Sequence, residues 1–248
     1  MNRIADAASV IAAARRGRTP LAPLPAALRP ADAAEAYRVQ DALHAALAPD
    51  LGAIVGHKIG CTTAVMQRYL KIDHPCAGGI FARTVHASGA ALPYRGFVRV
   101  GVECEIAVRL GRDLTIQSCM PAIELVDDRY VDWRQTDTAT LIADDFFGAG
   151  LVLGAPVPAA DAPDLAQVVG TTTINGEPVG QGRGADVLGH PHHALDWLKA
   201  HAAARGRPLQ AGDIVSTGSL VETRWLAPGD AVVVSLSGLG SVALTVTA

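Results

Sequence analysis

Two glutamates, Glu103 and Glu105, stand in an otherwise apolar segment that runs from residue 100 to residue 108. The segment has the composition of a β-strand, in which alternate side chains point to the same face. The two carboxylates would then lie together and repel each other unless a cation lies between them. Hard divalent cations such as Mg²⁺ and Mn²⁺ take oxygen ligands of this kind. The alternative is an ordinary solvent-exposed strand face with two glutamates. On the evidence of Glu103 and Glu105 alone, this alternative is favoured.

A third carboxylate, Glu124, shifts this balance towards a metal site. It lies in the apolar run 121–126, where a surface glutamate would be out of place. Buried carboxylates are rare unless they are paired or bound to a metal. The alternative is that Glu124 begins an acidic turn with Asp127 and Asp128, which follow closely. Three carboxylates in two apolar segments favour a divalent-metal site made by Glu103, Glu105 and Glu124.

Lys58 is the cation in the sequence best placed to meet an anionic substrate. It lies between Gly56 and Gly60 at the end of a short apolar run, so its ammonium could approach a carboxylate closely. An exposed lysine with no role is the alternative. His57 could carry a proton, although a lone histidine is more often structural.

The elements that would position these residues divide the chain into two regions. Residues 1–52 are rich in Ala, Leu, Arg and Glu and predict two helices, the second with Asp32 as N-cap and Glu35 three residues later. Residues 53–248 contain short runs of Val, Ile and Thr separated by glycines, which predict strands. Helices are expected within this part at 63–70, around 120–126 and at 193–204. The sequence therefore predicts an α+β fold, with a helical N-terminal region (1–52) and a strand-rich catalytic domain (53–248).

Composition excludes several classes of function. The net charge is −3 and the basic residues are scattered, so the chain lacks the basic surface of a nucleic-acid-binding protein. The four cysteines form no CxxC pair, which favours reduced thiols. No apolar run near the N-terminus has the length of a signal peptide or membrane span. We therefore expect a cytoplasmic protein with neither a nucleic-acid nor a membrane partner.

Several longer motifs resemble one known family. The matching stretches are GHKIGCTTAVMQRYLKIDHP (56–75), GIF (79–81), VECEIAVRLGRDL (102–114), PAIELVDDR (121–129), LIADD (141–145), INGEPVGQGRGADVLGHP (174–191) and GDIVSTGSL (212–220). In these stretches the chain resembles the 2-oxopent-4-enoate hydratase / 4-oxalocrotonate decarboxylase family, within the fumarylacetoacetate hydrolase superfamily. The resemblance implies a strongly bent β-sheet, a roll or barrel-like core with the active site at its mouth. It also implies a homo-oligomer, a dimer or larger.

The resemblance assigns roles to individual residues. It implies Mg²⁺ or Mn²⁺ held by Glu103, Glu105 and Glu124, with Lys58 near the substrate carboxylate. The chain departs from the family pattern in three places. The connection 109–121 between the two glutamate segments is shorter than the usual helical one. Arg83 stands where relatives often have an acid, and the segment after Ala143 reads Asp-Asp-Phe-Phe.

The reaction that we predict is the addition of water to a 2-hydroxy-2,4-dienoate. In this hypothesis the metal is a Lewis acid, and Asp144, held near neutral pH by apolar neighbours, is a proton carrier. Thr217 and Ser219 could hydrogen-bond the substrate, or they could be ordinary turn hydroxyls. Decarboxylation of a 2-oxo-3-enedioate is the close rival, with Arg83 binding the second carboxylate. An acylpyruvate hydrolase and a non-catalytic binding protein are the remaining alternatives.

Two further motifs carry no predicted function. The stretch 180–184 is rich in glycine but has no following Lys-Ser/Thr, so it does not predict a phosphate-binding loop. The histidines around Pro191 could indicate a second metal site. They more plausibly open a helix, with Pro191 in its first turn.

Overall fold

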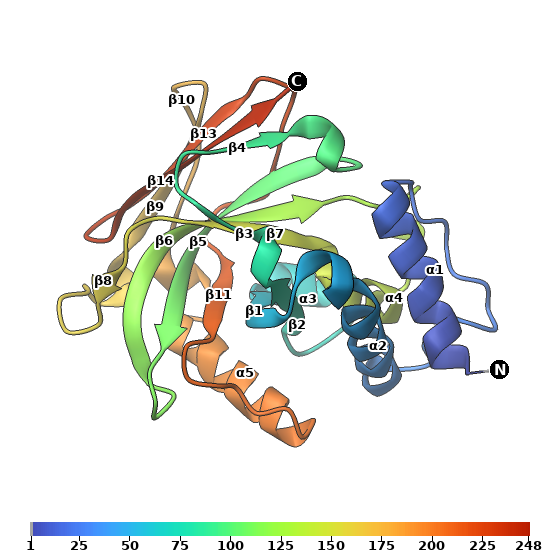
Figure 1. The fold of residues 1–248 in the computed structure, drawn as a ribbon. Helices are drawn as coiled ribbons and strands as arrows, with labels where there is room; N and C mark the ends of the chain where they lie inside the picture. Colours follow the sequence, from blue (N-terminus) through green and yellow to red (C-terminus); the bar gives the residue numbers. More distant parts are fainter. Residues whose placement is uncertain (1) are drawn as a thin grey trace.

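The computed structural model describes residues 2–248 and begins with two packed helices. They are α1 (Arg3–Gly17) and α2 (Ala33–Leu51), which pack against each other at one end of the molecule (Figure 1). Asp32 caps α2 by accepting from the Glu35 N–H. The Glu35 carboxylate accepts from the N–H of Ala31 and not from that of Asp32. Asp32 is therefore the N-cap as predicted, but the return hydrogen bond from Glu35 is made one residue earlier in the chain. The two helices expected in residues 1–52 are confirmed.

A nine-stranded mixed sheet forms the centre of the molecule. Its main path runs in the order β2-β1-β11-β5-β6-β7-β3, with β12 beside β5 and β8 beside β6. The strands are β1 (Ile54–Gly60), β2 (Cys76–Phe81), β3 (Val85–Ala87), β5 (Val100–Leu110), β6 (Ile116–Asp127), β7 (Gly148–Leu153), β8 (Val157–Pro158), β11 (Ile214–Ser219) and β12 (Arg224–Trp225). The β1–β11 and β3–β7 pairs are parallel, whereas β5, β6 and β7 are mutually antiparallel.

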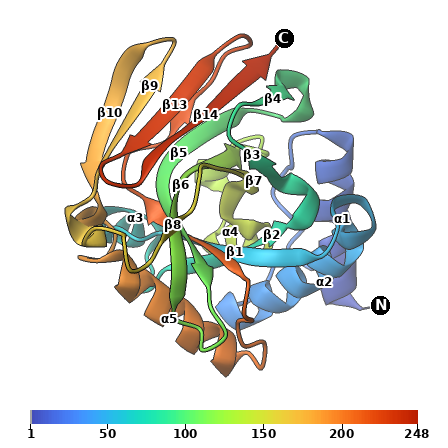
Figure 2. The same ribbon diagram turned by 60° about the vertical axis from the view of Figure 1, so that its left-hand side comes forward.

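A second sheet of five strands covers one side of the first (Figure 2). Its order is β10-β9-β13-β14-β4. The strands are β4 (Ala90–Pro93), β9 (Val169–Ile174), β10 (Glu177–Arg183), β13 (Ala231–Leu236) and β14 (Gly240–Thr247). Asn175 and Gly176 form the predicted hairpin turn between β9 and β10, both with positive φ. The predicted α+β class with a bent sheet is confirmed, as an open roll of two mixed sheets.

Three further helices lie around the large sheet. They are α3 (Ala64–Leu70), α4 (Thr138–Ala143), which contacts α2, and α5 (Pro191–Ala204), which contacts β11. Two of the three helices expected in this part are therefore confirmed. None of the helices in residues 2–248 is long and apolar enough to cross a membrane.

The helix predicted around residues 120–126 is wrong, because these residues belong to β6. A strand at the centre of a sheet is covered on both faces, so its apolar run is continuous and does not alternate. All residues from Ser118 to Asp127 are buried. The short connection to β5 is a tight turn, in which the Gly111 N–H donates to the Thr115 carbonyl at 2.8 Å. The strands are thus joined directly, with no helix between them.

Most of the buried apolar side chains form one core, and a smaller cluster lies apart from it. The smaller cluster consists of Ile80, Ala107, Met120, Ala122, Leu151 and Ile214. Ala107 follows Glu105 at period two on β5, and Ala122 precedes Glu124 in the same way on β6. The apolar cluster therefore lies on the same sheet face as the glutamates and continues beneath them.

Candidate active site

Strand register brings the three predicted metal ligands together. Glu103 on β5 lies directly opposite Glu124 on β6, and Glu105 lies two residues further along β5. Because side chains alternate between the faces of a sheet, all three point to one face. Carboxylate oxygens of the three residues lie within 4.8 Å of one another. This is the single group of three or more His, Cys, Asp or Glu side chains in residues 2–248 with such spacing.

The surroundings of these glutamates fit a divalent cation. Glu105 and Glu124 are 0% and 2% exposed. One oxygen of Glu105 and Oε2 of Glu124 have no hydrogen-bond donor, and the single partner of Oε1 of Glu124 is the Lys58 ammonium. Carboxylates buried in this way cost free energy unless a cation or donors compensate for them. An all-oxygen set of three carboxylates matches the preference of Mg²⁺, Mn²⁺ and Ca²⁺.

The pKa values of the buried pair reflect this crowding. Burial, together with the charge of Glu103, raises the pKa of Glu105 to about 7. Burial also raises the pKa of Glu124 well above its usual value, although Lys58 opposes this shift. A bound cation favours the ionised form of both groups.

Lys58 provides one positive charge beside the three carboxylates. It is 3% exposed on β1, and its Nζ lies 3.0 Å from Oε1 of Glu124. The ammonium also donates to the Phe146 carbonyl at 3.1 Å. Burial disfavours the charged form, but the charges of Glu124, Glu103 and Glu105 hold the pKa of Lys58 above its usual value. The lysine predicted from the glycine-flanked motif thus lies at the predicted metal site.

Two of the glutamates accept hydrogen bonds from donors that the sequence did not indicate. The Ser216 hydroxyl and the Gly218 N–H donate to one oxygen of Glu105, at 2.5 and 2.9 Å. The Thr223 hydroxyl donates to Glu103. Gly218 has a φ of 119°, and a Cβ there would lie 2.6 Å from Thr62, so glycine is required. No sequence signal indicates Ser216, because its pairing with Lys58 across β1 and β11 is formed only in the folded chain.

A cavity of about 410 Å³ reaches Lys58 and Glu124. Its lining includes Arg15, Arg83, Arg129, Phe81 and Leu151. The cavity is lined by several cations, so it suits a small anionic ligand.

Asp144 does not have the apolar neighbours that we expected. Its carboxylate lies 2.8 Å from Arg15 Nε, accepts from Arg129 Nε at 3.0 Å and accepts from the Tyr130 hydroxyl at 2.9 Å. The expected apolar setting is therefore wrong. Its role as a proton carrier stays a prediction, which these contacts disfavour because both oxygens already face cations or a donor.

The other predicted substrate-binding residues have backbone partners. Thr217 donates to the Ile106 carbonyl at 2.9 Å, and Ser219 donates to the Val221 carbonyl at 2.6 Å. Arg83 is exposed and donates to the carbonyls of Pro49 and Asp50 at the end of α2. It lines the same cavity as Lys58, whereas the two hydroxyls do not line it. Substrate contacts by all three residues stay predictions.

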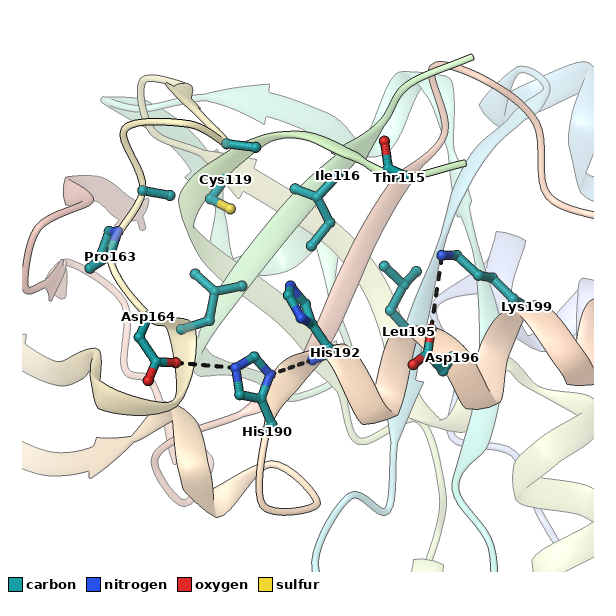
Figure 3. Close-up of a pocket in the computed structure, with 13 residues that line it drawn as sticks. Thr115, Ile116, Cys119, Pro163, Asp164, His190, His192, Leu195, Asp196 and Lys199 are labelled. Carbon is teal, nitrogen blue, oxygen red and sulfur yellow. Dashed lines mark hydrogen bonds and ion pairs between the residues drawn. The ribbon is translucent and has the colours of Figure 1, made fainter. Parts of the chain in front are cut away.

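The histidines around Pro191 open α5, as the sequence favoured. His190 is the N-cap, accepts from the His192 N–H and lies 3.2 Å from Asp164 (Figure 3). Pro191 occupies the first turn. His190 and His192 line a separate cavity of about 450 Å³, which is also bounded by Ile116, Cys119 and Leu195.

Comparison with known proteins identifies the family. The model of the fumarylacetoacetate (FAA) hydrolase C-terminal family matches residues 73–247. The chain therefore belongs to the FAA hydrolase family.

Several relatives of similar length are hydratases by name. The chain is 35% identical to a 2-keto-4-pentenoate hydratase of Paraburkholderia phymatum, an alignment that covers 97% of this chain and 96% of that one. It is 34% identical to the 2-keto-4-pentenoate hydratase of Burkholderia vietnamiensis, over 99% and 98% of the two chains. Among solved structures, it superposes on the 4-oxalocrotonate decarboxylase of Pseudomonas putida G7, complexed with magnesium and adipate. That match has a TM-score of 0.91 and 25% identity, and it covers 97% of this chain and 96% of the decarboxylase.

Proposed function

We propose that this chain is a divalent-metal-dependent hydratase. It adds water to a 2-hydroxy-2,4-dienoate of the 2-oxopent-4-enoate type and yields a 4-hydroxy-2-oxo acid. The observation that carries this proposal is the buried cluster of Glu103, Glu105 and Glu124 beside Lys58. It lies in a chain about one-third identical to named hydratases over nearly their whole length. Breakdown of aromatic compounds is the setting that fits this activity.

Mg²⁺ or Mn²⁺ is the ion that we propose for the site. Glu103, Glu105 and Glu124 would hold it, and Ser216 and Gly218 would keep Glu105 in place. When bound, the ion supplies a Lewis acid for negative charge that develops on the C2 oxygen of the substrate.

Lys58 binds the carboxylate of the substrate in this proposal. Its pKa is held above the usual value, so it stays protonated at neutral pH. It therefore acts as a fixed positive charge that orients the substrate and not as a proton carrier. The apolar cluster beneath the glutamates keeps water from the inner end of the site, which strengthens the electrostatic contacts there.

A decarboxylase is the second function that a specific observation favours. Arg83 lines the cavity that reaches Lys58, and the structure is similar to that of 4-oxalocrotonate decarboxylase. A second carboxylate on the substrate would need such a cation. The acylpyruvate hydrolase has less support, because that reaction usually needs a His–Glu pair to activate water. The histidines that form ion pairs in residues 2–248, His44 and His190, face aspartates.

Turnover of two substrates separates these functions. We would assay 2-hydroxypenta-2,4-dienoate and 2-oxohex-3-enedioate with Mg²⁺, with EDTA and with the Glu105→Gln variant. Loss of the dienoate with addition of water, abolished by EDTA and by the substitution, is the expected result. Release of CO₂ from the diacid would support the decarboxylase instead. Activity that survives both EDTA and the substitution would rule out the three-glutamate site.

We propose a homo-oligomer, a dimer or larger, that acts in the cytoplasm on a small 2-oxo acid or its dienol. Residues 53–248 form the catalytic domain, and residues 1–52 form a helical region that packs against it.

A further inference from the structure

Three consecutive residues beside the site have a left-handed backbone. Asp145, Phe146 and Phe147 have φ values of 56°, 49° and 68°, although none of them is glycine. Residues with a Cβ avoid this region because the Cβ crowds the following carbonyl, and runs of them are rarer still. Such a turn persists only where its surroundings determine it strongly. We call residues 145–147 the left-handed turn.

A buried set of charges holds this turn. The Asp145 carboxylate accepts from Arg15 Nη1 at 3.0 Å and from the Gly79 N–H at 2.9 Å, and it lies 2.6 Å from His44 Nε2. Burial opposes ionisation, but His44 and Arg15 hold the pKa of Asp145 below its usual value. The carboxylate is therefore ionised and anchored on three sides.

Arg15 contacts both sides of the turn and also binds the Asp145 carboxylate within it, whereas Arg129 donates to the carbonyls of Asp144, Phe147 and Gly148. The Arg15 guanidinium lies 2.8 Å from Asp144 and 3.0 Å from Asp145, and Nη2 donates to the Gly148 carbonyl at 3.0 Å. Its side chain is 11% exposed, although it belongs to the N-terminal helix α1. A planar guanidinium can make all of these bonds at once, which an ammonium cannot.

The turn presents one carbonyl to Lys58. The Phe146 oxygen accepts from Lys58 Nζ at 3.1 Å, and the Phe146 ring centroid lies 5.6 Å from the same nitrogen. Glu124 is the other partner of this ammonium. Two fixed partners leave the remaining N–H of Lys58 with a defined direction.

We propose that Arg15 is a positioning residue for Lys58, acting through the left-handed turn. Arg15 binds Asp145 and Gly148 and so fixes the turn. The fixed turn directs the Phe146 carbonyl towards Lys58, and this carbonyl orients the ammonium that binds the substrate carboxylate. This inference rests on the role given to Lys58 in the proposed function. It makes the N-terminal helix part of the active site.

Binding of oxalate tests the inference without relying on turnover. We would measure its dissociation constant by calorimetry on the Mg²⁺-loaded protein, for the wild type and for Arg15→Met, Arg15→Lys and Arg16→Met. Arg16 is the matched control, since it is the next residue of α1 and pairs with Asp50 on the surface. Because a small misplacement of a binding group is costly, Arg15→Met should weaken oxalate binding about tenfold or more. Arg15→Lys should restore only part of the affinity, and Arg16→Met should leave it unchanged.

Coupling to Lys58 separates positioning from general stability. In a Lys58→Met background, Arg15→Met should change the oxalate affinity by less than about twofold, because the group that it positions is gone. An equal loss in both backgrounds, or a folded Arg15→Met protein with unchanged affinity, would overturn the inference. If Arg15→Met fails to fold, Asp145→Asn takes its place in the same cycle and is decided by the same criterion.

The result also separates this inference from the proposed function. Coupling in the oxalate experiment, with no turnover of the dienoate, would refute the hydratase and leave the positioning role standing. Wild-type protein that binds oxalate no better than Lys58→Met would overturn the positioning role, whatever the turnover.

Discussion

Glu105 is the most buried of the three glutamates, and the protein already holds one of its oxygens. Ser216 and Gly218 both donate to that oxygen, which leaves the other oxygen, without a donor, to face a cation. Residues of this kind, which orient a ligand without touching the ion, commonly change metal affinity when they are replaced.

We therefore expect Ser216→Ala to weaken Mg²⁺ binding about tenfold. The substitution removes one of two donors and lets the Glu105 carboxylate rotate. Titration calorimetry of the metal-free protein measures the effect directly. Ser235→Ala, in an exposed position of β13, should bind Mg²⁺ as the wild type does. Equal affinities for the wild type and Ser216→Ala would mean that Ser216 does not orient Glu105.

Lys58→Met should have opposite effects on the two ligands. Removing a positive charge that lies 3.0 Å from Glu124 lowers the repulsion felt by a bound cation. We expect Mg²⁺ to bind at least as tightly, while the KM for the dienoate rises about tenfold or more, because the carboxylate loses a charged partner. Metal titration and steady-state kinetics on the same sample check both effects. Loss of Mg²⁺ binding in a folded variant would contradict this account.

The cluster of three glutamates could be predicted from the sequence, because a carboxylate in an apolar strand is conspicuous. The role of Ser216 could not be predicted, since a hydroxyl is equally ordinary in a turn, a strand or a site. The contacts of Asp144 show more clearly what local sequence cannot predict. Its partners Arg15 and Arg129 lie 129 and 15 residues away in the chain, and no local pattern indicates such pairs.

At the scale of elements, β6 shows where local patterns fail. Its apolar residues suggested a helix, but a central strand buried on both faces has no alternation by which to recognise it. The helices α1, α2 and α5 were predicted because their amphipathic spacing and caps are local features. The strand order was not predictable, because β1 and β11 pair in parallel across more than 150 residues of chain.

The packing of α5 against α2 should make stability depend on pH. His201 of α5 lies against Tyr37 of α2, with ring centroids 4.5 Å apart. Burial, with the nearby charges of Arg205 and His74, lowers the pKa of His201 to about 4. The unfolded chain takes up this proton near pH 6.5, so stability is full above that pH and falls as the pH drops towards 4.

We expect His201→Phe to reduce this loss. Phenylalanine keeps a ring between Tyr37 and Trp197 but takes up no proton. Urea denaturation at pH 7.5 and pH 5 should give a smaller drop in midpoint for His201→Phe than for the wild type. The exposed His193→Gln serves as the control and should follow the wild type. Identical drops in all three proteins would place the pH dependence elsewhere.

At the scale of the whole molecule, the site joins strands that are distant in the chain. The carboxylates come from β5 and β6, Lys58 from β1 and Ser216 from β11, all within the nine-stranded sheet. Three carboxyl groups and one ammonium group therefore meet at the centre of the fold. Without a cation, these buried carboxyl groups lower the free energy of unfolding of the metal-free protein. A bound cation would compensate for their charge.

Glu105→Gln should consequently stabilise the metal-free protein and remove its response to metal. The pKa of Glu105 is raised to about 7, so its ionisation penalty develops between the ordinary pKa of 4.5 and about pH 7, and it is full at pH 8. At that pH we expect metal-free Glu105→Gln to exceed the metal-free wild type by about 1–3 kcal/mol in unfolding free energy. Mg²⁺ at 100 times its dissociation constant should stabilise the wild type by about 2.7 kcal/mol and the variant by much less. Denaturation with EDTA or Mg²⁺ measures all four states, with the exposed Glu177→Gln as the control. A metal-free Glu105→Gln protein less stable than the wild type would show that Ser216 and Gly218 already compensate for this buried charge.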